Sequence, residues 1–161
     1  MHFYSYEKYL DYANLNRWLV CDVPSVLEEG KRFEEYKNDS ILDFTADFEM
    51  CEGIDLLLAN GSIQYVEWEL HEKLSKIKEK PRLVILNMTP LHEEFSTITL
   101  QSIGTSFCPY YLRLEKDFVR GMESIGYRLL DVWNNEEKRC NIAFEKKRSL
   151  DKYKGMVFCL D

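Results

Sequence analysis

Apolar runs and helical patterns alternate along the first half of the chain. Short strands are expected over residues 17–21 and 40–44. The longer apolar runs 53–62 and 82–90 are typical of strands buried on both faces of a parallel sheet. Residues 24–36 and 66–80 instead have apolar residues at helical spacing, with Pro24 opening the first segment and Pro81 following the second. The pattern predicts one parallel sheet from 17–21, 41–44, 55–59 and 82–87, with helices 24–36 and 67–79 in the crossovers.

The remaining segments complete an α/β pattern. A helix is expected over 2–13, another over 113–126, and strands over 127–134 and 153–161, joined by a charged connection. Residues 91–113 are rich in Thr, Ser, Tyr and Pro and predict a long loop, of the kind that often carries function. The whole predicts a single α/β domain over 1–161, a doubly wound and mostly parallel sheet closed by a hairpin-like strand pair.

Charge and cysteine usage narrow the classes of partner. The chain has 21 basic and 28 acidic residues and a net charge of −7, which disfavours nucleic acid and anionic lipid surfaces. Its five cysteines show no metal-ligand or disulfide spacing, and the histidines show none either, so no metal site is expected. No apolar run approaches the roughly 18 residues of a membrane span, and no signal peptide is visible at the start. We therefore expect a cytoplasmic protein without membrane or nucleic-acid partners.

Polar residues follow several of the predicted strands. Asp22 ends the run 17–21, where open α/β sheets place an acid on a ribose, although an acid before Val23-Pro24 is also an ordinary turn residue. Asn60-Gly61 is a common turn dipeptide, but the preceding "DLLLA" does not alternate as a hairpin strand would, which favours a functional turn.

Other candidates concern the reacting molecule. His92 lies just past a predicted strand end and is a candidate general base, with an ordinary surface histidine as the alternative. Tyr65, Tyr110 and Tyr111 are candidates for lining a small-molecule pocket, with a place in the core as the alternative.

The order of five segments resembles a known family. "WLVCDVPSVLEEGKRF", "DLLLANGSIQYVE", "RLVILNMTPLHEEFSTITLQSI" and "GYRLLDVW", closed by "YKGMVFCLD", are similar to bacterial class I S-adenosylmethionine-dependent methyltransferases, over nearly the whole chain. The resemblance implies the strand order 3-2-1-4-5-7-6 with the last strand antiparallel. It also implies methyl transfer from S-adenosylmethionine to a small-molecule or saccharide-like acceptor.

The same resemblance implies roles for individual residues. Asp22 would bind the cofactor ribose, Asp47 would lie near the adenine, and Asn60, Gly61 and Ser62 would face the methionine end.

The resemblance has one large departure. Members of the family have a first strand and a glycine-rich loop ahead of the helix that "HFYSYEKYL" resembles, and none of the seven glycines here can replace that loop. We therefore expect an incomplete cofactor site, in either a truncated reading or a naturally shortened relative. The empty strand position would be closed by direct pairing of its neighbours or by a segment from elsewhere, such as a second copy in a homo-oligomer. The alternative function is a non-catalytic binding or interaction module.

Overall fold

A computed structural model describes residues 2–37 and 41–161 and divides the chain into two compact units. The first unit comprises residues 1–51 and the second residues 52–161. The single domain expected over 1–161 stays a prediction. No helix among the described residues is long and apolar enough to cross a membrane.

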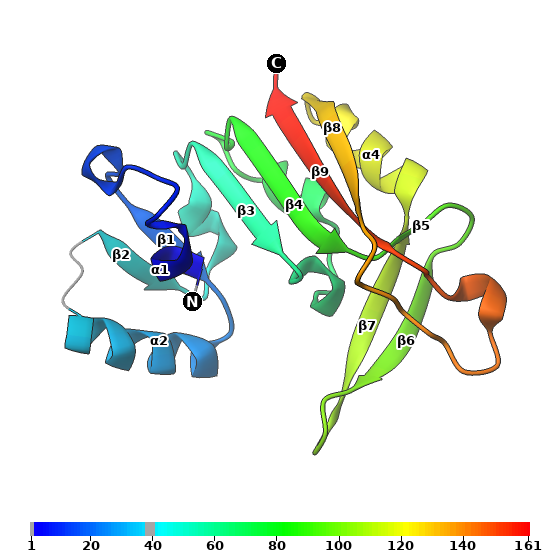
Figure 1. The fold of residues 1–161 in the computed structure, drawn as a ribbon. Coiled ribbons are helices and arrows are strands. Elements are labelled where there is room, and N and C mark those ends of the chain that lie inside the picture. Colours follow the sequence, from blue (N-terminus) through cyan, green and yellow to red (C-terminus); the bar gives the residue numbers. More distant parts are fainter. Residues whose placement is uncertain (1, 38–40) are drawn as a thin grey trace. The chain divides into compact units, whose positions relative to one another are not determined.

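The first unit is a two-stranded parallel sheet with a helical crossover (Figure 1). Its strands are β1 (Trp18–Cys21) and β2 (Leu42–Thr45), and helix α2 (Pro24–Lys37) connects them. Gly30 lets this helix approach the sheet closely, because a Cβ at that position would lie 2.6 Å from the Phe44 ring. The glycine that weakens the helix pattern in the sequence thus has a packing role.

The helix expected over 2–13 is broken into shorter elements. Helix α1 (His2–Tyr6) is followed by the 3-10 turn η1 (Tyr12–Asn14), and η2 (Phe48–Cys51) closes the unit. The Asp11 carboxylate accepts hydrogen bonds from the Ala13 N–H and the Asn14 side chain, so it begins a new turn rather than continuing the first helix. The prediction of one continuous helix is therefore wrong.

The second unit contains a four-stranded mixed sheet in the order β3-β4-β9-β8 (Figure 1). The strands are β3 (Leu56–Asn60), β4 (Leu83–Thr89), β8 (Tyr127–Asn135) and β9 (Tyr153–Leu160). β3 and β4 are parallel, whereas β9 runs antiparallel to both of its neighbours. The α/β class and the antiparallel last strand are thereby confirmed.

The prediction that all four early strands share one sheet is wrong. β1 pairs with β2, β3 pairs with β4, and the two pairs belong to separate sheets. The strand order within each sheet still matches the family order 3-2-1-4-5-7-6. β1 and β2 correspond to strands 2 and 3 of that order, and β3, β4, β9 and β8 correspond to strands 4, 5, 7 and 6. Within the described residues, no strand pairs with both β1 and β3 in the position of the family's first strand.

Residues 91–113 form strands instead of the long loop that their composition predicts. β6 (Thr97–Ser102) and β7 (Phe107–Leu114) make an antiparallel hairpin, and the short β5 (Leu91–His92) pairs parallel to the end of β7. The segment "TITLQS" alternates between half-buried and exposed residues, which is the period of a strand with one covered face.

The helix expected over 66–80 is reduced to α3 (Leu70–Leu74), preceded by the 3-10 turn η3 (Ile63–Tyr65). Arg113 binds the carbonyl groups of Val66 and Trp68, so those groups do not accept helical hydrogen bonds. Helix α4 (Glu115–Ser124) is close to its predicted range. The connection before β9 contains a β-bridge between Cys140 and Leu150 and the 3-10 turn η4 (Lys146–Arg148).

The core of the second unit lies between the mixed sheet and α4. Val84, Leu86 and Phe158 are completely buried in adjacent strands, and Phe118 of α4 packs near Phe158 with 6.4 Å between ring centroids. α3 contacts α4 through His71, which lies where a Cβ at Gly121 would stand. This packing supports the strands whose ends carry the candidate site.

Candidate functional site

The first unit brings Asp22 and Asp47 to the same edge of its sheet. Both follow parallel strands, whose carboxyl ends meet at the edge where open α/β sheets bind ligands. Asp22 is exposed, and its Oδ1 accepts the Val23 N–H at 2.8 Å. Asp47 is also exposed, and its Oδ1 accepts the Glu49 N–H at 2.9 Å. One oxygen of each carboxylate therefore shapes the local turn.

A pair of cysteines lies at this edge and was not singled out from the sequence. The Cys21 thiol donates a hydrogen bond to Cys51, which together with burial raises the pKa of Cys21. Accepting that bond lowers the pKa of Cys51, because it stabilises the thiolate. Asp22 and Asp47 both raise the pKa of Cys21 electrostatically, which places their charges close to this pair.

In the second unit, the ends of β3 and β4 meet at the turn Asn60-Gly61-Ser62. The Gly61 N–H donates to the Asn87 carbonyl at 2.9 Å. Gly61 has φ +65°, in the left-handed region that favours glycine, so the chain turns sharply as it leaves β3. The Asn87 side-chain oxygen accepts hydrogen bonds from Trp133 Nε1 at 3.1 Å and Asn135 Nδ2 at 3.0 Å. These hydrogen bonds connect the end of β4 to β8 across the sheet.

Two buried side-chain oxygens at these strand ends have no hydrogen-bond partner among the described residues. They are Oε1 of Gln64, in the turn after Ser62, and Oγ1 of Thr89, at the end of β4. The Gln64 amide lies beside Gly61, since a Cβ on that glycine would stand 3.7 Å from Gln64 Nε2. Buried polar atoms are normally paired, so unpaired ones at a ligand-binding edge are candidates for polar contact with a bound molecule.

Of the three candidate pocket tyrosines, the structure brings two together. Tyr65 and Tyr110 pack edge to face with 5.4 Å between ring centroids. The Tyr110 and Tyr153 hydroxyl groups are 2.7 Å apart, and Met88, directly after Asn87, packs against the cluster that contains both. Burial raises the pKa of Tyr110 and raises that of Tyr153 to about 12. Tyr153 was not identified from the sequence.

Tyr111 is separated from this group by the alternation of β7. Successive side chains of a strand point to opposite faces, so Tyr111 lies on the other side from Tyr110. Its ring lies 5.6 Å from the Arg113 guanidinium carbon, in a cation–π contact.

His92 is buried and both of its ring nitrogens are engaged. Nδ1 accepts the backbone N–H groups of Glu94 and Phe95 at 2.9 and 3.1 Å, and Nε2 lies 2.9 Å from the Lys147 carbonyl. Nδ1 is therefore the unprotonated nitrogen, and Nε2–H donates to the carbonyl. This arrangement fixes the neutral ring between two loops and disfavours a role as general base, which stays a prediction.

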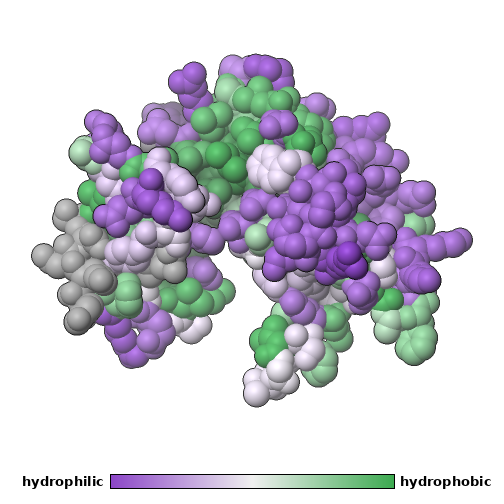
Figure 2. All heavy atoms as spheres, in the orientation of Figure 1, coloured by the Kyte–Doolittle hydropathy of each residue, from purple (hydrophilic) through white to green (hydrophobic). Residues whose placement is uncertain are grey.

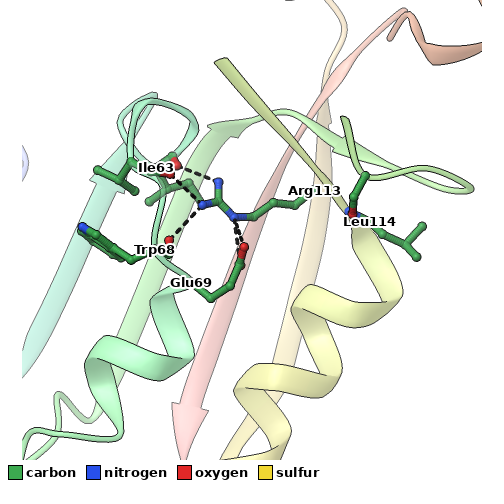
Figure 3. A network of polar contacts seen from close by, with 7 residues as sticks. Ile63, Trp68, Glu69, Arg113 and Leu114 are labelled. Carbon is green, nitrogen blue, oxygen red and sulfur yellow. Dashed lines mark hydrogen bonds and ion pairs between the residues drawn. The ribbon is translucent and has the colours of Figure 1, made fainter. Parts of the chain in front are cut away.

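Arg113 organises the loop that follows β3, and it was not among the site residues predicted from the sequence (Figure 3). Its Nε lies 3.0 and 2.9 Å from the two carboxylate oxygens of Glu69. Its other nitrogens donate to the carbonyls of Ile63, Val66 and Trp68 at 2.8 to 2.9 Å. The only signal in the sequence was a charged residue inside the apolar run "PYYLRL". The guanidinium holds residues 63–69, which include Gln64 and Tyr65, in one conformation.

No protein-family model matches the chain, and no curated protein matches it. The chain is, however, similar to several solved structures. A protein from Listeria monocytogenes, provisionally assigned as an S-adenosylmethionine-dependent methyltransferase, aligns with a TM-score of 0.63 at 12% identity, over 91% of this chain and 81% of that one. An S-adenosylmethionine-dependent methyltransferase from Clostridium acetobutylicum ATCC 824 gives a TM-score of 0.59 at 9% identity, over 89% and 75% of the two chains.

An S-adenosylmethionine-dependent methyltransferase from Mesorhizobium loti gives a TM-score of 0.57 at 11% identity, over 89% of this chain and 80% of that one. Structural similarity at identities this low establishes the fold alone, so the chemistry has to be argued from the site residues. The chain therefore has the mixed α/β, Rossmann-like fold found in S-adenosylmethionine-dependent methyltransferases.

Proposed function

We propose that this protein binds S-adenosylmethionine and transfers its methyl group to a small-molecule or saccharide-like acceptor. The observation that carries the proposal is the position of β9, the last strand in sequence, which lies antiparallel between β4 and β8. This is the arrangement that the family resemblance implies, and it sets the positions 4-5-7-6 of the family order next to one another.

Asp22 and Asp47 are proposed to bind the adenosine part of the cofactor. Asp22 Oδ2 has no hydrogen-bond partner among the described residues and is in solvent, so it is available to accept hydrogen bonds from ribose hydroxyls. Asp47 uses one oxygen to cap its turn, which leaves the second for the exocyclic amine of adenine. The donor and acceptor types of both residues therefore fit an adenosine.

Asn60, Gly61 and Ser62 are proposed to face the methionine part. A glycine at φ +65° leaves no side chain over the turn, and a Cβ there would reach Gln64 and Met88 at 3.7 Å. Gln64 and Thr89 offer the unpaired buried oxygens of this edge. An amide and a hydroxyl are suited to the amino and carboxylate groups of a methionine end, so the residues present fit that group.

The acceptor is proposed to lie against Tyr65 and Tyr110. The substrate role expected for Tyr111 stays a prediction, because its side chain lies on the opposite face of β7. S-adenosylmethionine supplies an electrophilic methyl group when it is bound. The residues of this chain contribute mainly by positioning the acceptor, which is a large part of the rate in such reactions. Arg113 supports this role indirectly, because it holds the backbone next to Tyr65. His92 remains the proposed base for a hydroxyl acceptor, provided that Nδ1 is released from its two N–H donors.

We further propose that residues 1–161 hold an incomplete cofactor site and bind weakly. No glycine-rich turn precedes β1 within the described residues, and such a turn normally presents backbone N–H groups to the ligand. The contacts proposed above have to offset the loss of ligand freedom, which costs several kcal/mol.

The test uses S-adenosylhomocysteine as the probe, because it carries the adenosine and amino acid parts without the reactive methyl. A nitrogen-15 labelled chain is titrated and the amide shifts are followed, a method that detects weak binding. We expect saturable shifts at Val23, Glu49 and Gly61, the amides beside the proposed contacts. Asp22→Ala should weaken binding by about 1.5–3 kcal/mol, the range of a hydrogen bond to a charged group.

Asp131→Ala is the matched control. The Asp131 Oδ1 accepts the N–H of the next residue at 2.8 Å, as Asp22 does, but it lies on β8 away from the carboxyl ends of β3 and β4. It should leave the affinity unchanged. If S-adenosylhomocysteine shifts none of these amides, the proposal is wrong and the non-catalytic module becomes the better reading. Equal weakening by the two variants would remove the ribose role of Asp22.

A further inference from the structure

The β6–β7 hairpin presents an uncharged surface in a strongly charged protein. Residues 95–112 contain no Asp, Glu, Lys or Arg, although 30% of the chain is charged. The hairpin extends away from the four-stranded sheet, and its projecting end is white and green in the hydropathy view (Figure 2). A charge-free projection is unusual for a surface whose only partner is water.

One face of this hairpin consists of large exposed apolar side chains. Ile98 and Leu100 of β6 are 66% and 67% exposed, and Phe107 of β7 is 71% exposed. The register sets Ile98 opposite Tyr111 and Leu100 opposite Pro109, so these residues form one continuous face. The opposite face carries Tyr110 and Leu112, which are buried in the core cluster described above. We call the first of these the outer face.

β6 is also an edge strand without the usual protection. In the order β5-β7-β6, no described strand pairs with the edge of β6 that faces away from β7. Native proteins usually block such edges with a charge, a proline or a bulge, and "TITLQS" has neither a charge nor a proline and pairs with β7 without a register shift. The strand therefore offers a partner both the backbone N–H and C=O groups of its open edge and an apolar face.

We propose that β6 pairs antiparallel with β6 of a second copy of this chain, so that the two outer faces join in one sheet in the order β5-β7-β6-β6-β7-β5. Antiparallel pairing of a strand with itself is closed by a two-fold axis, which makes the contact self-complementary. An axis through Thr99 sets Ile98 of one copy opposite Leu100 of the other and keeps the apolar side chains on one face.

Charge explains why the second copy is the occupant. Each copy carries a net charge of −7, so two copies repel one another over most of their surface. The 18 uncharged residues 95–112 are the segment where this repulsion is weakest, and they coincide with the open edge. A basic or acidic partner would find no complementary charge on this face. The proposal is independent of cofactor binding and goes beyond the proposed function.

Sedimentation velocity on the full chain tests the pairing over a roughly hundredfold range of concentration, because association depends on mass action. We expect the wild-type chain to shift from monomer to dimer across this range. Leu100→Lys and Ile98→Lys each place a charge on the β6 edge and should leave the chain monomeric throughout. Val132→Lys is the control, since Val132 is an exposed apolar residue on β8, an edge strand of the four-stranded sheet. It should dimerise like the wild type.

Amide hydrogen exchange supplies a second readout that does not depend on a variant. Exchange at the amides of β6 that point away from β7 should slow as the wild-type concentration rises, while exchange in β8 stays constant. A wild-type chain that remains monomeric over the whole range would overturn the proposal and leave the outer face to a different partner. A dimer that survives both lysine substitutions, or that leaves exchange in β6 unchanged, would place the interface elsewhere and overturn it equally.

Discussion

Arg113 on β7 holds Glu69 with its Nε 2.9 Å from the nearer carboxylate oxygen, across 44 residues of sequence. The arginine side chain is buried, whereas the glutamate is partly exposed. The same guanidinium also binds three backbone carbonyls of the loop after β3. One side chain therefore replaces the helical hydrogen bonds that residues 66–69 would otherwise make, and it determines the path of the chain beside Gln64 and Tyr65.

We expect Arg113→Ala to destabilise the protein by about 3–5 kcal/mol, because it leaves a partly buried carboxylate and several carbonyls without a donor. Arg113→Lys should recover only part of the loss, since an ammonium group cannot reproduce the planar fork of a guanidinium. Urea unfolding followed by circular dichroism gives both values. Arg128→Ala, which removes an exposed ion pair with Asp161, should cost less than about 1 kcal/mol. Similar losses at the two arginines would contradict the role assigned to Arg113.

Gly155 and Trp133 give a second prediction. They lie directly opposite on β9 and β8, and a Cβ at Gly155 would overlap the Trp133 indole. Gly155→Ala should therefore displace the indole, break its hydrogen bond to Asn87 and cost about 1–3 kcal/mol, the range for overpacking. Urea unfolding measures the cost, and the indole N–H resonance of Trp133 reports the broken bond.

The same substitution in a Trp133→Leu background separates this clash from other effects of alanine. If the indole is the obstacle, Gly155→Ala should cost much less in the double variant than in the wild type. An equal cost in both backgrounds would show that the glycine is needed for a different reason.

Tyr153 gives a prediction for the dependence of stability on pH. Burial raises its pKa from 10.0 to about 12, although the hydrogen bond with Tyr110 partly opposes this. Between these two values the unfolded chain has lost the phenolic proton while the folded chain still holds it. Stability is therefore fully present below pH 10 and falls as the pH rises from 10 to 12. One such group contributes a slope of up to about 1.4 kcal/mol per pH unit.

Urea unfolding at a series of alkaline pH values measures this slope. Tyr153→Phe should make the fall between pH 10 and 12 shallower. Tyr127→Phe should do the same independently, because burial raises the pKa of Tyr127 to about 12 as well. Slopes that match the wild type in both variants would show that these phenols titrate alike in the folded and unfolded chains.

Local pattern by itself determined much of the fold. The runs that became β1, β3 and β4 are mostly apolar and bounded by turn residues, which is the pattern that predicted them as strands. The expected burial on both faces fits Val84 and Leu86 of β4, but it is wrong for β3, where Leu56 is exposed. The same reasoning put Asp22 and Asn60-Gly61 at strand ends, because a chain leaving a buried strand needs polar or flexible residues. The antiparallel last strand came from the family resemblance, and the pairing of β9 with β4 and β8 confirms it.

Only the tertiary structure decided how the remaining segments were used. Residues 97–114 form a hairpin because β6 pairs with β7, and composition alone did not reveal this pairing. Residues 66–69 leave the helical path because Arg113, far along the chain, captures their carbonyls. Tyr110 meets Tyr153 across 43 residues. Burial and turn chemistry are local in sequence and can be predicted from it, whereas strand partners and captured carbonyls depend on distant residues that meet only in the folded chain.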